Sequence, residues 1–317
     1  MANTPNTSTG VEDIETSTSL TELTRCEGLW YEDGSIVLAS EGVGFRVYRM
    51  LLAQNSSVFA NMLAMSSPES NIDPSYDCPI VHMPDSAAQL RYLLLALHDV
   101  RATERLKRAP FMETIAVASL AAKYEIGHLL DSAVERFASM YPTSFNKWVT
   151  TRGTPVTPVL KPGQHHAALQ LAHQLQMSHL VPVILLAMCY GGVRSILRSG
   201  LPPHDLEVLL LGFTKLQVMQ RTHTFRWLYR PVVRCTAPAS CNRRRAEMSL
   251  LMEKMFSCDK LYVFDLSLEQ FSVPLSEVLC DRCVTDAFRT QKAGLESAWE
   301  DLPSVFGMET WHKLGAK

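Results

Sequence analysis

Two cysteines near the end of the chain have the spacing of a metal-binding turn. Cys280 and Cys283 are separated by two residues, and in structural zinc sites this gap lets both thiolates face one ion. Cys235 and Cys241 would supply two further ligands, although the five residues between them exceed the usual gap. The sequence therefore raises the hypothesis of a structural zinc ion held by Cys235, Cys241, Cys280 and Cys283.

Simpler interpretations of these cysteines stay open. All four can equally be free or buried thiols, with Cys258 as a further thiol between the two pairs. A thioredoxin-like use of Cys280 and Cys283 is not favoured, because no clear strand pattern leads into the amphipathic helix that follows. Zinc is the one cofactor that this residue pattern makes a candidate.

A basic segment before the second cysteine pair is the candidate for nucleic-acid contact. Residues 221–246 contain no acidic side chain, and their arginines alternate with aromatic residues. The basic residues are Arg221, Arg226, Arg230, Arg234 and Arg243 to Arg245, and the aromatic ones include Phe225, Trp227 and Tyr229. Such a mixture suits phosphate contacts and base stacking. The favoured interpretation is an exposed helix face followed by a basic loop, because no nucleic-acid-binding fold accompanies the segment.

No catalytic constellation is recognisable. His165, His166, His173 and His179 are separated by gaps that prevent them from meeting at one ion on a single helix. The chain lacks a Gly-x-Ser-x-Gly elbow, a phosphate-binding loop and a His-Glu-x-x-His helix. We therefore assign no catalytic residue and expect a protein that is not an enzyme.

Composition indicates an ordinary globular protein of two structured units. The chain has 317 residues, of which 47% are hydrophobic and 20% charged, with a formal net charge of −2. No global field would draw it to nucleic acid or to a membrane surface. Met1 to Thr24 lack the pattern of an export signal, and the longest apolar run, Leu180 to Val193, is short and interrupted. We expect an intracellular protein without a membrane segment, with cytoplasm and nucleus as open alternatives.

Four segments are expected along the chain: a disordered arm at 1–25, an α+β unit at 26–142, a linker or exposed loop at 143–164, and a helical domain at 165–317. In the α+β unit, alternating patterns predict strands over Ser35–Ala39, Phe45–Tyr48 and Pro79–Met83. Ser86 and Gln89 form a capping pattern that begins a helix, and a helical hairpin is expected over Phe111–Tyr124 and His128–Met140.

The last segment is mainly helical by its apolar spacing. Helices are expected over Ala167–Leu180, Val183–Gly191, Asp205–Met219, with Asp205 as the cap, and Cys283–Trp299. Leu261 to Phe264 fit either a strand or a buried helix.

An ordered series of residues in the first half resembles a BTB/POZ domain. It runs through Trp30–Leu38, Phe45–Arg49 and Leu52–Phe59. Residues in register with the family pattern are Asp33, Leu52, Ala53, Ser56, Phe59 and Met62, followed by Pro79–Asp85, Leu120–Ile126 and Leu129. The resemblance implies an α+β fold: a small mixed sheet capped by helices, followed by a mainly α-helical region.

The whole chain is similar to the fungal branch of this family, in which a helical region and a cysteine-containing tail follow the domain. The tail of that branch ends in a series matched here by Trp299, Leu302-Pro303, Phe306 and Trp311. The resemblance implies a scaffold that binds other proteins and forms a homodimer. The candidate interaction residues are Asp33, Phe45, Tyr48, Leu52, Ser56, Phe59 and Met62.

Two departures from the family pattern bear on function. Tyr48 stands where many members carry a histidine, which leaves the partner of Asp33 undetermined. Leu97 to Val100 replace the tyrosine and glycine seen in many adaptors of cullin-type ubiquitin ligases. Besides the scaffold, the sequence leaves two alternatives: a nuclear regulator whose basic, cysteine-containing half binds nucleic acid, and an adaptor of such a ligase.

Overall fold

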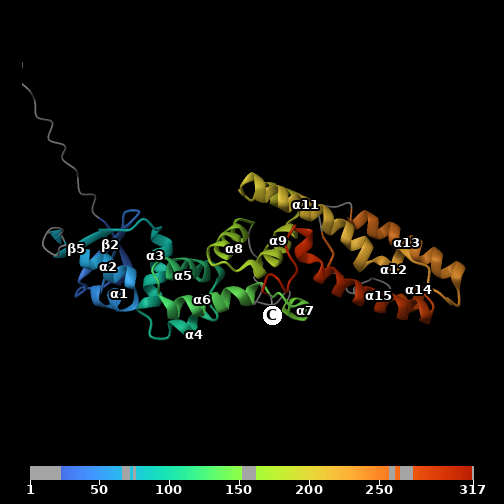
Figure 1. Cartoon of the computed structure of the whole chain (residues 1–317), viewed down its shortest axis with the longest axis horizontal. Helices are drawn as coiled ribbons and strands as arrows, with labels where there is room; N and C mark the ends of the chain where they lie inside the picture. Colours follow the sequence, from blue (N-terminus) through green and yellow to red (C-terminus); the bar gives the residue numbers. More distant parts are fainter. Residues whose placement is uncertain are drawn as a thin grey trace, which may run out of the picture.

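A mixed β-sheet lies at one end of the molecule, and helices make up the rest (Figure 1). The computed structural model describes residues 23–65, 72–73, 76–151, 162–256, 261–264 and 274–315. The chain is α+β, as expected: strands concentrate in its first quarter and helices follow. In the part of the chain described, no helix has both the length and the apolar character needed to cross a bilayer.

The sheet has five strands in the order β1-β3-β2-β5-β4. The strands are β1 (Thr24–Trp30), β2 (Ile36–Ser40), β3 (Val43–Val47), β4 (Ile72–Asp73) and β5 (Cys78–His82). Strands β2 and β3 form an antiparallel hairpin, whereas β1 runs parallel to β3 and β5 runs parallel to β2. Glu41 and Gly42 both have positive φ in the hairpin turn, which a glycine accommodates without strain. The three strands expected from the sequence correspond to β2, β3 and β5.

Strand β1 begins at Thr24, inside the segment expected to be a disordered arm. Thr24 and Arg25 pair with Val43 and Gly44 of β3, and Leu29 is fully buried. Pairing with a neighbouring strand thus extends the ordered region toward the N-terminus by a few residues. The rest of the predicted arm, residues 1–22, lies outside the described residues.

Six helices cover the sheet and extend from it. They are α1 (Arg49–Asn55), α2 (Ser57–Met65), α3 (Ala87–Leu97), α4 (Ala102–Leu106), α5 (Phe111–Lys123) and α6 (Gly127–Met140). The Ser86 hydroxyl accepts a hydrogen bond from the Gln89 amide at the start of α3, which is the predicted cap. Helices α5 and α6 correspond to the predicted hairpin.

A further helix, α7 (Phe145–Thr151), occupies the start of the segment expected to be a linker or exposed loop. Its Trp148 side chain is buried, so this part of the segment packs against the core and does not run free. Residues 152–161 lie outside the described part of the chain.

The remaining helices form the second half of the molecule. They are α8 (Pro162–Gln174), η1 (Ser178–Leu180), α9 (Val181–Cys189), α10 (Gly192–Leu197), α11 (Pro203–Met219), η2 (Gln220–Thr224, a π-helix), α12 (Arg226–Tyr229), α13 (Pro238–Phe256), α14 (Leu275–Val278), α15 (Asp281–Glu300) and α16 (Leu302–Val305). Helix α11 begins two residues before Asp205, which lies in its first turn, so the prediction of Asp205 as the cap was wrong. Leu261 to Phe264 adopt a turn, neither the strand nor the helix expected.

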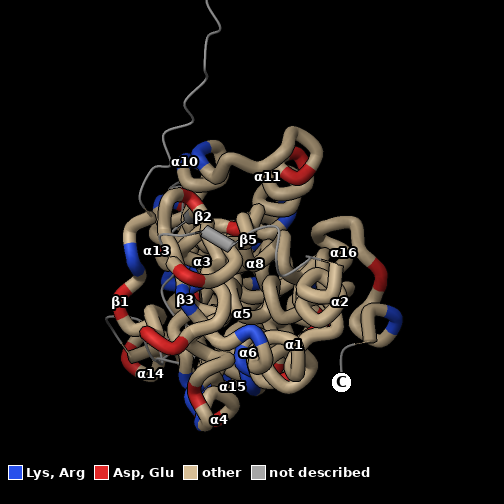
Figure 2. The backbone as a smooth tube through the Cα atoms, turned by 90° about the vertical axis from the view of Figure 1, so that its left-hand side faces the viewer, with Lys and Arg blue, Asp and Glu red and all other residues tan. Residues whose placement is uncertain are grey.

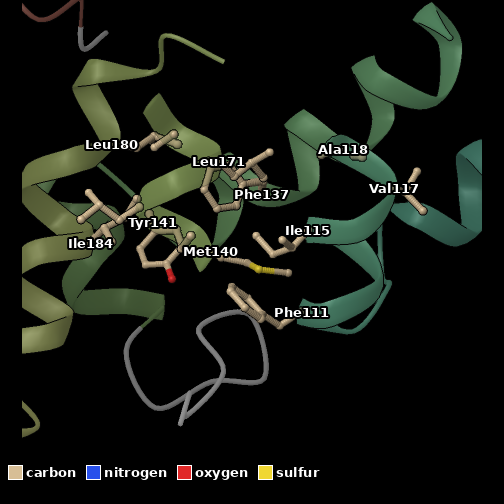
Figure 3. Packing of buried hydrophobic residues seen from close by; sticks show 14 of the residues in the cluster. Phe111, Ile115, Val117, Ala118, Phe137, Met140, Tyr141, Leu171, Leu180 and Ile184 are labelled. Carbon is tan, nitrogen blue, oxygen red and sulfur yellow. The ribbon is translucent and has the colours of Figure 1, made fainter. Parts of the chain in front are cut away.

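Two apolar cores hold these elements. The first continues from the sheet through α5 and α6 into α8, α9 and the C-terminal residues. Figure 3 shows Ile115 of α5, Met140 of α6, Leu171 of α8 and Ile184 of α9 along this core. The second core is smaller and joins α12 and α13 to α14 and α15. Acidic and basic residues are interspersed around the molecule, in keeping with its small net charge (Figure 2).

Candidate metal centre and predicted interaction residues

The four predicted cysteine ligands meet in the structure. The sulfur atoms of Cys235, Cys241, Cys280 and Cys283 all lie within 4.8 Å of one another. The Sγ atoms of Cys235 and Cys280 are 3.7 Å apart, and those of Cys235 and Cys283 are 3.4 Å apart. Four sulfurs about 2.3 Å from a tetrahedral zinc ion would be separated by about 3.8 Å. The cluster therefore has the donor type and the size of a zinc site.

Two helix starts bring the cysteines together. Cys241 lies in the first turn of α13, Cys280 caps α15, and Cys283 lies in the first turn of α15. The backbone amide of Cys280 donates a hydrogen bond to the Cys241 sulfur over 3.3 Å. Because helix N-termini carry partial positive charge, both helices favour negatively charged thiolates at this point.

The cluster has an inner and an outer pair of thiols. Cys241 and Cys283 are 1% and 2% exposed and belong to the second core, whereas Cys235 and Cys280 are half-buried. Burial raises the pKa of the Cys241 and Cys283 thiols. Hydrogen bonds, chiefly from Thr236, lower the pKa of Cys280 to about 5. Cys280 thus supplies a thiolate, the form that binds metal, at neutral pH.

Two arginines fix the connection that carries Cys235. This connection lies between α12 and α13, and Arg234 within it has a positive φ of 64°. The buried Arg245 guanidinium donates to the Arg230 carbonyl, and Arg282 donates to the Arg234 carbonyl over 3.0 Å. The sequence pattern did not identify these supporting side chains, although Arg282 lies between the two cysteines of the recognised pair.

The other cysteines do not join the cluster. Cys26, Cys78 and Cys189 are buried elsewhere in the chain, and Cys258 lies outside the described residues. Among the residues described, the four-cysteine group is the one place where three or more potential metal ligands converge. The histidines flagged in the sequence are spread over α8 and η1, and His165 faces the Tyr141 hydroxyl at 3.4 Å.

The basic segment is only partly exposed. Arg221 forms a bidentate ion pair with Glu253, and Arg243 and Arg244 pair with Glu247. Phe225 and Trp227, which would stack on bases in the nucleic-acid interpretation, are buried in the second core. The helical turns η2 and α12 come before the connection at 230–237, but Arg243 to Arg245, expected in a basic loop, lie in α13.

Most of the predicted interaction residues are structural. Phe45, Leu52, Ser56 and Phe59 are buried in the first core and have almost no exposed surface for a partner. The other three reach the surface to different extents: Asp33 is exposed, and Tyr48 and Met62 are half-buried. The buried residues contribute to any association by shaping the fold, because they have so little surface of their own.

Three hydrogen bonds fix predicted interaction residues in the fold. The Ser56 hydroxyl accepts from the Phe59 amide over 2.9 Å and donates to the Tyr124 carbonyl over 2.5 Å, while the Phe59 and Tyr124 rings stack. The Tyr48 hydroxyl donates to Asp33 over 2.9 Å, and this bond raises the pKa of Tyr48. Asp33 therefore keeps a partner despite the missing histidine.

Comparison with known proteins adds no assignment. No protein-family model matches the chain, and neither a curated protein nor a solved structure is significantly similar to it.

Proposed function

We propose that this protein is an interaction scaffold that self-associates through a BTB/POZ-like first half and offers its helical second half to another protein. The observation that carries the proposal is the contact between Ser56 and Tyr124. These residues come from two separately recognised parts of the family pattern, 68 residues apart, and they meet through a hydrogen bond beside stacked rings. The ordered sequence matches thus have a common spatial basis.

The end of the molecule formed by α1 and α2 is the candidate surface for self-association. It lies beside the sheet, at the end of the molecule opposite α13 and α14, and is not covered by the second half (Figure 1). Met50 on α1 is 67% exposed and Met65 on α2 is 86% exposed. Long, flexible methionine side chains suit adaptable protein contacts.

The second half carries its own exposed apolar side chains. Those on the three longest helices are Leu211 and Val218 on α11, Leu250 and Leu251 on α13, and Phe288 on α15. Surface apolar residues grouped on helices support a role in binding another protein.

A charge-introducing variant tests the self-association. The double change Met50→Glu and Met65→Glu should shift sedimentation equilibrium toward monomer, because two carboxylates would have to be desolvated at the interface. Val100→Glu is the matched control, since Val100 is also exposed but lies outside α1 and α2. Equal association of both variants and the natural chain would contradict this surface.

We also propose that Cys235, Cys241, Cys280 and Cys283 bind one structural zinc ion. The four-sulfur donor set and its tetrahedral size support zinc over magnesium or calcium, which prefer oxygen ligands. The ion would join the starts of α13 and α15 beside a core too small to be robust alone.

Metal analysis of protein purified without added metal tests the zinc site. One zinc per chain is expected, and Cys283→Ser should abolish it, whereas Cys26→Ser, a change to a buried thiol outside the cluster, should not. A zinc content well below one per chain in the natural protein would contradict the site and indicate that the cysteines only pack in the core.

The two alternatives stay open. Binding of the full chain to nucleic acid at low salt, with a steep salt dependence, would favour the nuclear regulator, because phosphate contacts release counterions. Co-purification with a cullin from the native cell would favour the ligase adaptor.

A further inference from the structure

We infer that the outer thiol pair, Cys235 and Cys280, is an oxidation site at which a hydroperoxide forms a disulfide and releases the metal. This inference rests on the zinc site proposed above and adds a chemical reaction to it. It starts from the unequal exposure of four sulfurs that otherwise share one site.

Access separates the two pairs. Cys241 and Cys283 lie in the second core among Trp227, Leu279 and Ala287, so a polar oxidant reaches them only if that core opens. The half-buried Cys235 and Cys280 are accessible from solvent in the folded protein. Oxidation should therefore begin at the outer pair.

Geometry supports a bond between the outer sulfurs. They are 3.7 Å apart, and a disulfide requires about 2.05 Å, so closing the gap needs a shift of about 1.7 Å. Cys235 lies in the connection before α13 and Cys280 at the cap of α15, and neither position is inside a regular helix. Small movements of both residues can share the shift.

The chemistry balances with a hydroperoxide as the oxidant. With hydrogen peroxide as the hydroperoxide, one outer thiolate attacks a peroxide oxygen, the O–O bond breaks, and a sulfenic acid and a hydroxide form. The second outer thiolate attacks that sulfur, the S–S bond forms, and the second hydroxide leaves. Two protons from the buffered solution convert the two hydroxides to water, and the two sulfur atoms have together given up two electrons. Only two of four thiolates then remain for the ion.

The site thereby differs from a closed structural site, in which all ligands are buried. The outer disulfide itself joins the start of α15 to the connection before α13, so a covalent link replaces the two zinc ligands there, while Cys241 and Cys283 stay in the second core. Oxidation would release the ion from the two inner thiols, keep the two helix starts joined and leave the first core intact.

The test follows zinc release and disulfide formation in the full-length protein treated with hydrogen peroxide. Zinc content is measured first, then release is followed with a chelating dye, and disulfides are mapped by mass spectrometry without reduction. We expect a Cys235–Cys280 disulfide to appear together with zinc release. Dithiothreitol should reduce this disulfide. A Cys235–Cys283 or Cys241–Cys283 link as the main product would overturn the inference.

A ligand-preserving variant sharpens this test. Cys280→His keeps a zinc ligand, because sites with three cysteines and one histidine are common, but it removes one of the outer sulfurs. Its zinc should be released by peroxide at least about tenfold more slowly than that of the natural chain. Cys26→Ser should release zinc at the natural rate. If Cys280→His holds no zinc, the disulfide formed in the natural chain tests the inference on its own: a Cys235–Cys280 product supports it, and any other main product contradicts it.

The outcomes separate the two proposals. A natural chain that purifies without zinc contradicts the zinc site itself. A chain that holds zinc but loses it at the same rate in Cys280→His, or whose peroxide product lacks the outer disulfide, keeps the zinc site and contradicts the oxidation.

Discussion

The indole nitrogen of Trp299 donates a hydrogen bond to the carbonyl oxygen of Thr143, 2.8 Å away and 156 residues earlier in the chain. Trp299 also stacks on Trp311 and packs beside Trp148 of α7. The C-terminal aromatic series therefore closes over the end of the first half. The two halves of the sequence share one core at this point.

Removing this hydrogen bond should weaken the junction of the two halves. Trp299→Phe keeps most of the ring but leaves the Thr143 carbonyl without the indole donor, at a cost of about 1–3 kcal/mol in the free energy of unfolding. Urea denaturation measures the change. Trp30→Phe is the control, because the buried Trp30 nitrogen has no hydrogen-bond partner among the described residues and its loss should cost less. Equal losses would contradict the role of the Thr143 contact.

Ser56 should be sensitive to truncation although it is small. Ser56→Ala removes both the acceptor of the Phe59 amide and the donor to the Tyr124 carbonyl, so we expect a loss of about 1–3 kcal/mol. Ser139→Ala, at an exposed serine of α6, should stay within about 0.5 kcal/mol of the natural chain. Chemical denaturation followed by circular dichroism provides both values.

Helix α15 passes so close to η2 that only glycine fits at the crossing. A methyl group at Gly294 would overlap the backbone carbonyl of His223, which cannot move aside as a side chain can. Gly294→Ala should destabilise the protein by about 1–3 kcal/mol despite the better helix propensity of alanine. Gly127→Ala is the matched change, because a methyl group there meets no atom within 4 Å. A thermal melt in which both variants behave alike would argue against the close crossing.

His165 should make stability depend on pH. Burial lowers the pKa of His165 to about 4, below the value of about 6.5 for an unfolded histidine. Between these values the unfolded chain binds more protons, so stability is complete above pH 6.5 and falls as the pH drops toward 4, by about 1–3 kcal/mol. His165→Gln should flatten this part of the profile, whereas His128→Gln, at an exposed position, should not. Unfolding curves at several pH values distinguish the two variants.

Stripping the metal should affect one core more than the other. After chelation, backbone amides near the start of α13 and α15 should exchange hydrogen faster, because the proposed ion joins these helix starts. Amides of α5 and α6, in the first core, should keep their protection. Faster hydrogen exchange in both cores, or no change in exchange anywhere, would contradict a zinc ion that stabilises the second core locally.

The sequence predicted elements whose pattern is local. The strands β2, β3 and β5 and the hairpin α5–α6 each repeat apolar residues at their own period, and Ser86 carries the cap of α3. Strand β1 was missed because only Cys26 and Leu29 are buried in it, and its pairing with β3 comes from tertiary contact.

Helix α13 was missed for a related reason. Its buried face contains Arg245 between Cys241 and Met252, and a buried arginine hides the helical period of apolar residues. Its burial depends on the Arg230 carbonyl, a contact that spacing along the chain does not reveal.

The sequence was sufficient to predict the four ligands of the candidate metal site, but not how they come together. The spacing of Cys280 and Cys283 indicated a pair, but the approach of Cys235 and Cys241 depends on how α13 and α15 pack around Trp227. For the interaction residues, the family pattern identified positions such as Leu52 and Phe59 that build the fold. A partner-binding surface is harder to predict from the sequence, because packing does not constrain the residue types at exposed positions.

The molar mass of the full-length protein in solution tests the central proposal most directly. Sedimentation equilibrium over a wide range of concentrations should approach twice the chain mass of 35.5 kDa as the concentration rises. A mass of one chain at every accessible concentration would contradict self-association through the BTB/POZ-like half.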